Sequence, residues 1–169
     1  MTDVPVSDTL EREAVKEIAS HALTSKDPLT RKHAIYLLGM MRNPACVDIF
    51  LQTLRDPEKA VRAQATRALA DMGGPASERL ISLLSDPDWK VRYRAAEALG
   101  MMKEKRLVCP LVAILSDEKD HVRYMAAKAL GEIGVCDAIG PISSLLNDEN
   151  PYVKRIAESA IVKLKSPPL

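Results

Sequence analysis

The stretch DPDWKVRYRAAEALG, residues 86–100, decides the fold of this protein. At about 100° per residue of an α-helix, Val91 and Ala95 fall on one face. Trp89 and Tyr93 fall on nearly the opposite face, away from these small aliphatic residues. The stretch therefore predicts an amphipathic helix with a buried aliphatic face, and its two aromatic residues need a separate explanation.

The same pattern returns along the chain, which predicts a repeat protein. Copies begin at Asp56, Asp86, Asp117 and Asp148, 30 or 31 residues apart, and a weaker copy begins at Ser25. A second apolar helix precedes each copy, and the loops between the helices are only a few residues long. Helices joined in this way pack antiparallel and bury their apolar faces against the next pair.

We therefore predict an all-α protein, a right-handed α-solenoid of five two-helix repeats with ten helices. One domain is expected to span residues 1–169, with residues 166–169 as a tail. The five expected repeats are residues 8–41, 43–72, 75–102, 105–134 and 136–165.

The repeated aspartate is expected to have two roles. It stands at the start of the second helix of each repeat, where an Asp side chain is a favourable N-cap. Arginine recurs six places later, at Arg62, Arg92 and Arg123, with Lys154 in the last repeat. Because a guanidinium group can bridge carboxylates of adjacent turns, we predict a ladder of Asp–Arg pairs between repeats.

Composition limits the classes of function. The formal net charge is +1, so no global charge favours a nucleic acid or an anionic membrane as the partner. No apolar run is long enough for a bilayer span and no signal peptide is recognisable, which predicts a cytoplasmic protein. Three cysteines without paired spacing are expected to be small buried residues, and we expect no metal site and no cofactor.

Every Tyr and the only Trp fall on outward positions of the second helices. Such residues are typical of binding surfaces, so we predict a concave groove that is aromatic and mildly basic. The alternative is that these rings only fill the spaces between repeats over small alanines. The expected groove residues are Tyr36, Trp89, Lys90, Tyr93, Arg94, Glu97, His121, Tyr124, Met125, Lys128, Tyr152 and Arg155.

The pattern D-P-x-x-x-V-R-x-x-A-x-x-A-L-G resembles the HEAT-like repeats of the phycobilin-lyase type, and the resemblance covers essentially the whole chain. It implies a solenoid of the armadillo type. It also implies one route to an enzyme, in which the groove of a lyase subunit holds a tetrapyrrole. Arg and Lys would then meet the propionates, and the aromatic residues would stack on the pyrrole rings.

The sequence favours a non-enzymatic scaffold that binds an acidic peptide or protein in this groove. A phycobilin-lyase-like subunit is the alternative, and nucleic-acid binding resembling HEAT-like DNA glycosylases is less favoured because the basic excess is thin. No residue is assigned a catalytic role. The His–Glu pairs of the similar deoxyhypusine hydroxylases are missing, since His21 and His33 are followed by Ala and His121 by Val.

Overall fold

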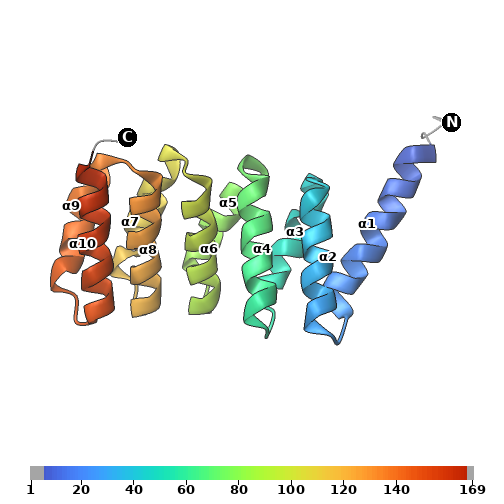
Figure 1. Ribbon diagram of the computed structural model, residues 1–169, viewed down its shortest axis with the longest axis horizontal. Coiled ribbons are helices and arrows are strands. Elements are labelled where there is room, and N and C mark those ends of the chain that lie inside the picture. The colour runs from blue at the N-terminus through green and yellow to red at the C-terminus, as the bar shows by residue number, and fades with distance from the viewer. Residues whose placement is uncertain (1–5, 167–169) are drawn as a thin grey trace. The chain divides into compact units, whose positions relative to one another are not determined.

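The computed structural model describes residues 6–166, with side chains from residue 12 onward. Within that range the protein contains ten α-helices and no β-strand, and short 3-10 turns flank the first helix of several pairs (Figure 1). The all-α prediction and the predicted number of helices are thus confirmed. No helix in this part of the chain is both long and apolar enough to cross a membrane. The helices are α1 Val6–Thr24, α2 Pro28–Met40, α3 Val47–Thr53, α4 Lys59–Met72, α5 Gly74–Ser82, α6 Trp89–Met102, α7 Val108–Ala113, α8 Asp120–Ile133, α9 Ile139–Ser143 and α10 Pro151–Lys165.

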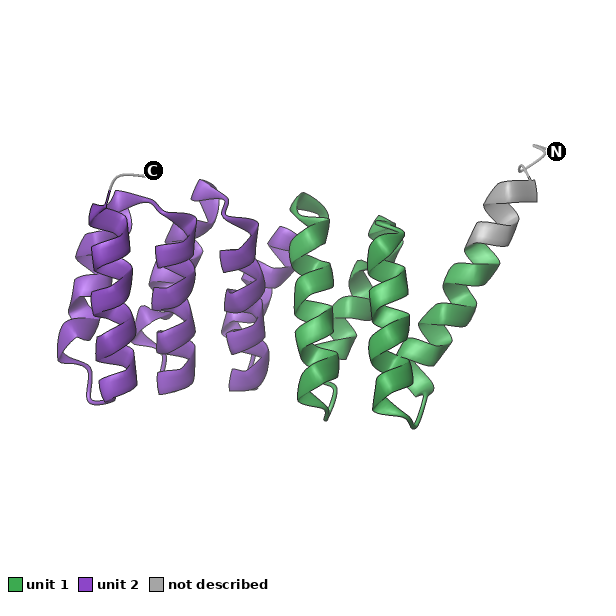
Figure 2. Ribbon diagram, viewed as in Figure 1, with its two compact units in different colours: residues 1–75 green, residues 76–169 purple. Residues whose placement is uncertain are grey.

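The chain divides into two compact units, residues 1–75 and residues 76–169 (Figure 2). The five helix pairs begin and end close to the five predicted repeats. That the whole chain forms one domain stays a prediction.

In the first unit, α2 contacts both α1 and α4, and α3 packs against α4. Its core is aliphatic around the only phenylalanine of the chain, Phe50, which is fully buried with Ile35, Leu38 and Leu69. Burying side chains of this size contributes about 1.5–3 kcal/mol each relative to exposing them.

In the second unit, α6, α8 and α10 lie side by side, with α7 against α8 and α9 against α10 (Figure 1). Val91 and Ala95 of α6 are buried, as the helical periodicity predicts. Trp89 and Tyr93, on the other face of the same helix, are half-buried. The aliphatic face of the quoted stretch therefore forms the core, and the aromatic face is left partly open.

Two glycines let the second helices of this unit approach closely. A Cβ atom on Gly100 of α6 would lie 2.6 Å from the Cβ of Ala129 in α8. A Cβ atom on Gly131 of α8 would lie 2.9 Å from the Cβ of Ala160 in α10. Small residues on both partners are thus a condition for the contact between the C-terminal halves of these helices.

The predicted Asp–Arg ladder is confirmed within each unit. Arg92 donates from Nε to Asp117 Oδ2 over 2.7 Å and from Nη2 to Oδ1 over 2.8 Å. The two side chains are 9% and 7% exposed, so the pair is nearly buried. Arg123 pairs in the same bidentate way with Asp148 in the second unit, and Arg31 pairs with Asp56 in the first.

Each ladder arginine also ties down the loop of its own repeat. Arg92 Nη1 donates to the backbone carbonyl of Asp86 over 2.8 Å, and Arg123 Nη1 donates to that of Asp117 over 2.9 Å. One guanidinium group therefore joins two consecutive loops. This explains why Asp and Arg recur together at a constant spacing.

The prediction that these aspartates are N-caps is wrong. The second helices begin three residues later, and Asp117 Oδ1 instead accepts a hydrogen bond from the backbone N–H of Lys119 over 2.8 Å. Asp148 does the same with Asn150. The carboxylate closes a loop turn and pairs with the arginine of the preceding repeat.

The cysteine prediction is confirmed for one residue only. Cys46 is buried, and burial raises the pKa of its thiol. Cys109 and Cys136 are exposed, so the prediction is wrong for both. They lie in the short first helices and their turns, where a small residue next to a loop remains in contact with solvent.

The ladder predicts an acid-sensitive fold. Burial alone would raise the pKa of the Asp117 carboxyl, but hydrogen bonds from Arg92 and from the Lys119 backbone hold that pKa below its ordinary value of 3.8. A group with a lowered pKa stabilises the folded state above its unfolded pKa, and this contribution is lost as pH falls through the folded pKa. We expect the free energy of unfolding to decrease below about pH 4, as measured by urea titration at successive pH values.

The variant Asp117→Asn isolates this contribution. It should be less stable than the wild type at neutral pH, and its stability should fall less steeply in acid, because the titrating group is gone. Asp137→Asn, at an exposed carboxylate, is the matched control and should follow the wild type. Parallel acid profiles for Asp117→Asn and the wild type would contradict the assignment.

Candidate functional site

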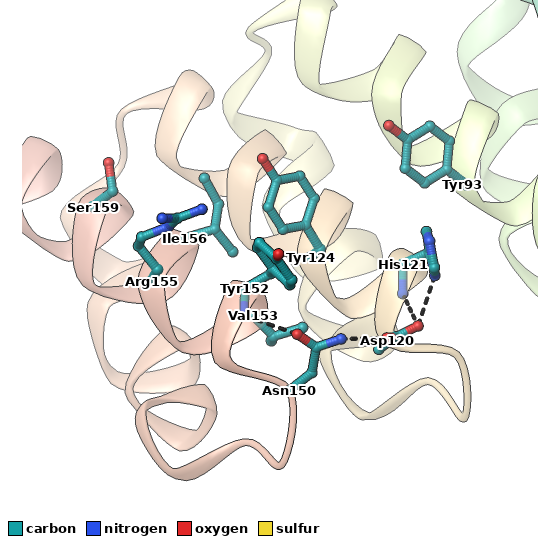
Figure 3. A pocket seen from close by; sticks show the side chains of 10 residues that line it. All are labelled: Tyr93, Asp120, His121, Tyr124, Asn150, Tyr152, Val153, Arg155, Ile156 and Ser159. Carbon is teal, nitrogen blue, oxygen red and sulfur yellow. Dashed lines mark hydrogen bonds and ion pairs between the residues drawn. The ribbon is translucent and has the colours of Figure 1, made fainter.

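A pocket of about 670 Å³ opens between the N-terminal halves of α8 and α10, with Tyr93 of α6 at its edge (Figure 3). This volume is within the range of small-molecule sites, about 300–1,000 Å³. All of its residues belong to the second unit. They are Tyr93, Asp120, His121, Tyr124, Asn150, Tyr152, Val153, Arg155, Ile156 and Ser159.

Three tyrosines from three helices supply the aromatic surface of the pocket. Tyr93 and Tyr124 are half-buried, and Tyr152 is exposed. Burial raises the pKa of the Tyr93 phenol, and the nearby Glu97 carboxylate adds to the effect. Tyr93 and Tyr124 follow the core Val of their repeats by the same number of residues, which places them on the same face of α6 and α8.

A polar chain crosses the rim of the pocket from α10 to α8. Asn150, the N-cap of α10, donates from its side-chain amide to Asp120 Oδ2. Asp120 Oδ1 lies 2.7 Å from His121 Nδ1. The His121 ring lies beside Trp89 of α6, with 5.0 Å between ring centroids. Hydrogen bonding to His121, then to Asn150, lowers the pKa of the Asp120 carboxyl.

The cationic group of the pocket is Arg155 of α10. Its guanidinium carbon lies 5.4 Å from the centre of the Tyr152 ring, a cation–π contact, and the residue is exposed. Within residues 12–166, no carboxylate forms an ion pair with Arg155. The pocket thus contains a guanidinium group that can bind a carboxylate beside aromatic rings.

A second, smaller pocket of about 370 Å³ lies over the C-terminal halves of α6 and α8. The two acidic residues that line this pocket, Glu97 and Glu132, are both ion-paired. Arg94 pairs with Glu97 over 2.6 Å, and Lys163 pairs with Glu132 over 3.0 Å. The pocket is lined by Glu97, Gly100, Met101, Lys103, Met125, Lys128, Ala129 and Glu132.

The structure separates the predicted groove residues into groups. Five of them line the first pocket: Tyr93, His121, Tyr124, Tyr152 and Arg155. Three line the second: Glu97, Met125 and Lys128.

The other four are placed differently. Trp89 contacts His121, and Lys90 is exposed on α6. Arg94, expected to face outward, is buried at 8% exposure. Tyr36 belongs to the first unit and is exposed there.

The sequence places Asp120 and Ile156 at outward positions of the second helices, but sequence reasoning missed Asn150, Val153 and Ser159 of the first pocket. A signal for Asn150 was present, because Asn directly before Pro151 is typical of an N-cap followed by a proline at the first helical position. Among the described residues, no group of His, Cys, Asp and Glu side chains is arranged to hold a metal ion.

Both a protein family and a curated protein are similar to this chain in sequence. The chain matches the HEAT repeats family over residues 15–78 and 77–162. It is 35% identical over 99 residues to phycocyanobilin lyase subunit alpha of Nostoc sp. (strain PCC 7120), covering 53% of this chain and 36% of that protein. The match thus spans about a third of the length of this curated relative.

Solved structures of helical repeat proteins superpose on this chain. A chain in the complex of CpcE and CpcF of phycocyanin lyase from Nostoc sp. PCC7120 superposes with a TM-score of 0.64 at 28% identity, over 89% of this chain and 65% of that one. Human deoxyhypusine hydroxylase superposes with a TM-score of 0.55 at 19% identity, over 90% and 74% of the two chains, which shows the fold alone.

A designed armadillo repeat protein in complex with the peptide (KR)4 also shares the fold alone, with a TM-score of 0.56 at 17% identity over 94% and 84% of the two chains. The family match covers most of the chain, and the paired helices and their Asp–Arg ladder account for it in physical terms. The chain belongs to the HEAT-repeat family, with repeats similar to those of phycobilin lyase subunits.

Proposed function

We propose that this chain is a phycobilin-lyase-like subunit that binds an open-chain tetrapyrrole in the pocket between α8 and α10. The observation that carries the proposal is the combination of groups in this pocket. Three tyrosines, a histidine and one arginine, which has no ion-pair partner among residues 12–166, line the same cavity. The sequence similarity to phycocyanobilin lyase subunit alpha supports it. Sequence reasoning had placed this function second, behind a protein-binding scaffold.

The tyrosines suit the conjugated rings of such a ligand. An open-chain tetrapyrrole is a flat, largely apolar molecule, and aromatic side chains supply a large contact area with few rotatable bonds. Tyr93, Tyr124 and Tyr152 come from the second helices of three successive repeats, so their rings extend along the pocket. A ligand made of several linked rings can contact more than one of them.

The polar groups of the pocket suit both the carboxylates and the N–H groups of a tetrapyrrole. Tetrapyrroles carry propionate carboxylates, which an arginine binds by charge-assisted hydrogen bonds. Arg155 is exposed at the pocket and its guanidinium rests on the Tyr152 ring, which limits its positions before binding. The pyrrole N–H groups require acceptors, and His121 and the Tyr93 hydroxyl lie on the side of the pocket away from Arg155 (Figure 3).

A separate observation favours protein binding as a second function. Four large apolar residues of the first unit are exposed on or just after α2, namely Leu29, Leu37, Met40 and Met41. Exposed apolar patches are typical of protein interfaces. The similar structure from Nostoc is a complex of two proteins, CpcE and CpcF, which supports a protein partner for this chain as well.

Titration with phycocyanobilin tests the proposed function. We expect the pigment to quench the emission of Trp89, the only tryptophan, because Trp89 touches His121 at the pocket. Tyr124→Ala and Arg155→Ala should each weaken pigment binding by about tenfold, since one stacking ring or one charged hydrogen bond is lost. Pigment absorbance gives an independent measure of the dissociation constant.

Tyr36→Ala is the matched control. Tyr36 is another exposed tyrosine on a second helix, but it belongs to the first unit and is not one of the pocket residues. Its removal should leave pigment affinity unchanged. Pigment binding that is absent in the wild type, or equally weakened by Tyr36→Ala and Tyr124→Ala, would overturn the proposed function.

A further inference from the structure

We infer that Asp120 holds His121 as the tautomer with its proton on Nδ1, so that His121 Nε2 is a hydrogen-bond acceptor for an N–H group of the bound ligand. The identity of that ligand, a tetrapyrrole with pyrrole N–H donors, rests on the proposed function. Asp120 is a positioning residue in this scheme, and His121 is the residue that meets the ligand.

Both oxygens of Asp120 already accept hydrogen bonds within the protein. Its Oδ1 accepts from the backbone N–H of His121 over 2.7 Å and lies at the same distance from the Nδ1 of that ring. Its Oδ2 accepts from the Asn150 amide. An N–H donor that enters the pocket therefore meets, in His121 Nε2, an acceptor that no other described residue uses.

The cap of α10 fixes the direction of this chain of hydrogen bonds. Asn150 Oδ1 accepts from the backbone N–H of Tyr152 over 2.8 Å, so its NH₂ group must be the part that faces Asp120. Asp120 can only accept, which makes His121 Nδ1 the donor. The tautomer therefore follows from the ionised carboxylate of Asp120, and the helix cap fixes the other end of the chain of hydrogen bonds.

The orientation of the ring is limited from both sides. Asp120 holds Nδ1, and the Trp89 ring lies against the imidazole at an interplanar angle of 45°. The side chain is nevertheless 65% exposed and lines the pocket with the three tyrosines. A second hydrogen bond to an imidazole fixes which nitrogen is left free, the arrangement used to aim histidines in metal and catalytic sites.

A purely structural role would be to join α8 to α10 through Asp120 and Asn150. Asp120→Asn separates the two roles. The new amide can accept on one side only. With its oxygen toward the Asn150 NH₂ group, its own NH₂ faces His121 Nδ1, and the backbone N–H of His121 loses its acceptor. The tie between the helices then survives, but the ring must accept at Nδ1 and carry its proton on Nε2.

The exchange Asp120→Asn/Asn150→Asp is the rescue variant. Asp is as good an N-cap as Asn, so the start of α10 is kept. The carboxylate at position 150 accepts the NH₂ group of the new Asn at position 120, which again turns its oxygen toward His121. The Nδ1 proton should return, and the net charge of the pair is unchanged.

Nitrogen NMR of the histidine ring measures the tautomer directly, at about pH 9 where ordinary histidine is neutral. The signal of His121 is assigned by its loss in His121→Gln. We expect the proton on Nδ1 in the wild type, on Nε2 in Asp120→Asn, and on Nδ1 again in the exchange variant. A wild-type ring protonated on Nε2 would overturn the inference.

The same three proteins are titrated with phycocyanobilin. Asp120→Asn should bind about two- to tenfold more weakly, the value of one hydrogen bond, and the exchange variant should regain wild-type affinity. Equal affinities for all three, or an Nε2 signal that stays in place when pigment binds, would also overturn the inference. Wild-type protein that binds no pigment would overturn the proposed function instead, whichever tautomer is found.

Discussion

Replacing Arg92 with Ala should lower the free energy of unfolding by about 3–5 kcal/mol, the largest effect we expect from one side chain. The change leaves the Asp117 carboxylate nearly buried without its bidentate partner, and it frees the backbone carbonyl of Asp86. An uncompensated buried charge costs far more than the ion pair contributes. Urea unfolding followed by far-ultraviolet circular dichroism measures the loss.

Two further variants test the cause. Arg92→Ala/Asp117→Ala should recover part of the stability, because neither charge is then left alone. Arg106→Ala removes an arginine that is half exposed and pairs with Glu104 and Glu78 on the surface, so its effect should be much smaller. If Arg92→Ala and Arg106→Ala lowered the free energy of unfolding equally, burial of the Asp–Arg pair would not be the cause of the loss.

The second large effect is expected at Gly100. An Ala there would place its Cβ 2.6 Å from the Cβ and 2.8 Å from the Cα of Ala129, and the second of these atoms belongs to the backbone. Such overpacking costs about 1–3 kcal/mol, against a gain of up to about 1 kcal/mol from the better helix propensity of Ala. We therefore expect Gly100→Ala to be destabilised in thermal and urea unfolding.

Gly39→Ala is the matched control for this prediction. Gly39 stands near the end of α2, and a Cβ atom on it would lie 3.4 Å from the Cβ of Ala68, an ordinary contact. Its helix gains propensity without a clash, so stability should stay the same or increase by up to about 1 kcal/mol. If both substitutions had the same sign, close contact between α6 and α8 would not be the reason for Gly100.

The helical periodicity and the repeat spacing were enough to predict the fold. The buried face of residues 86–100 follows from a local geometric rule, and the pairing of Arg92 with Asp117 follows because every repeat places the same two residues in the same register. A repeat protein is the favourable case for such reasoning, since each unit contacts mainly its neighbours. The start of α6 was missed because the Asp86 carboxylate serves the loop and not the helix end.

The candidate site was predicted only in part. A helical wheel gives the direction of a side chain but not its depth, so Arg94 was expected on the surface and is buried with Glu97 as its partner. The pairing of Asn150 with Asp120 joins residues 30 positions apart that have no counterpart in the other repeats. No periodic signal could have indicated it.

The sequence by itself determined the helix pairs, their register and the Asp–Arg ladder, because these depend on spacings that recur from repeat to repeat. Only the tertiary structure decided which outward residues share a cavity and where the acceptor groups of His121 and Asp120 point. Those depend on side chains from α6, α8 and α10 meeting in space, and on hydrogen bonds that each form between one particular pair of residues. Local spacing carries no information about such single contacts.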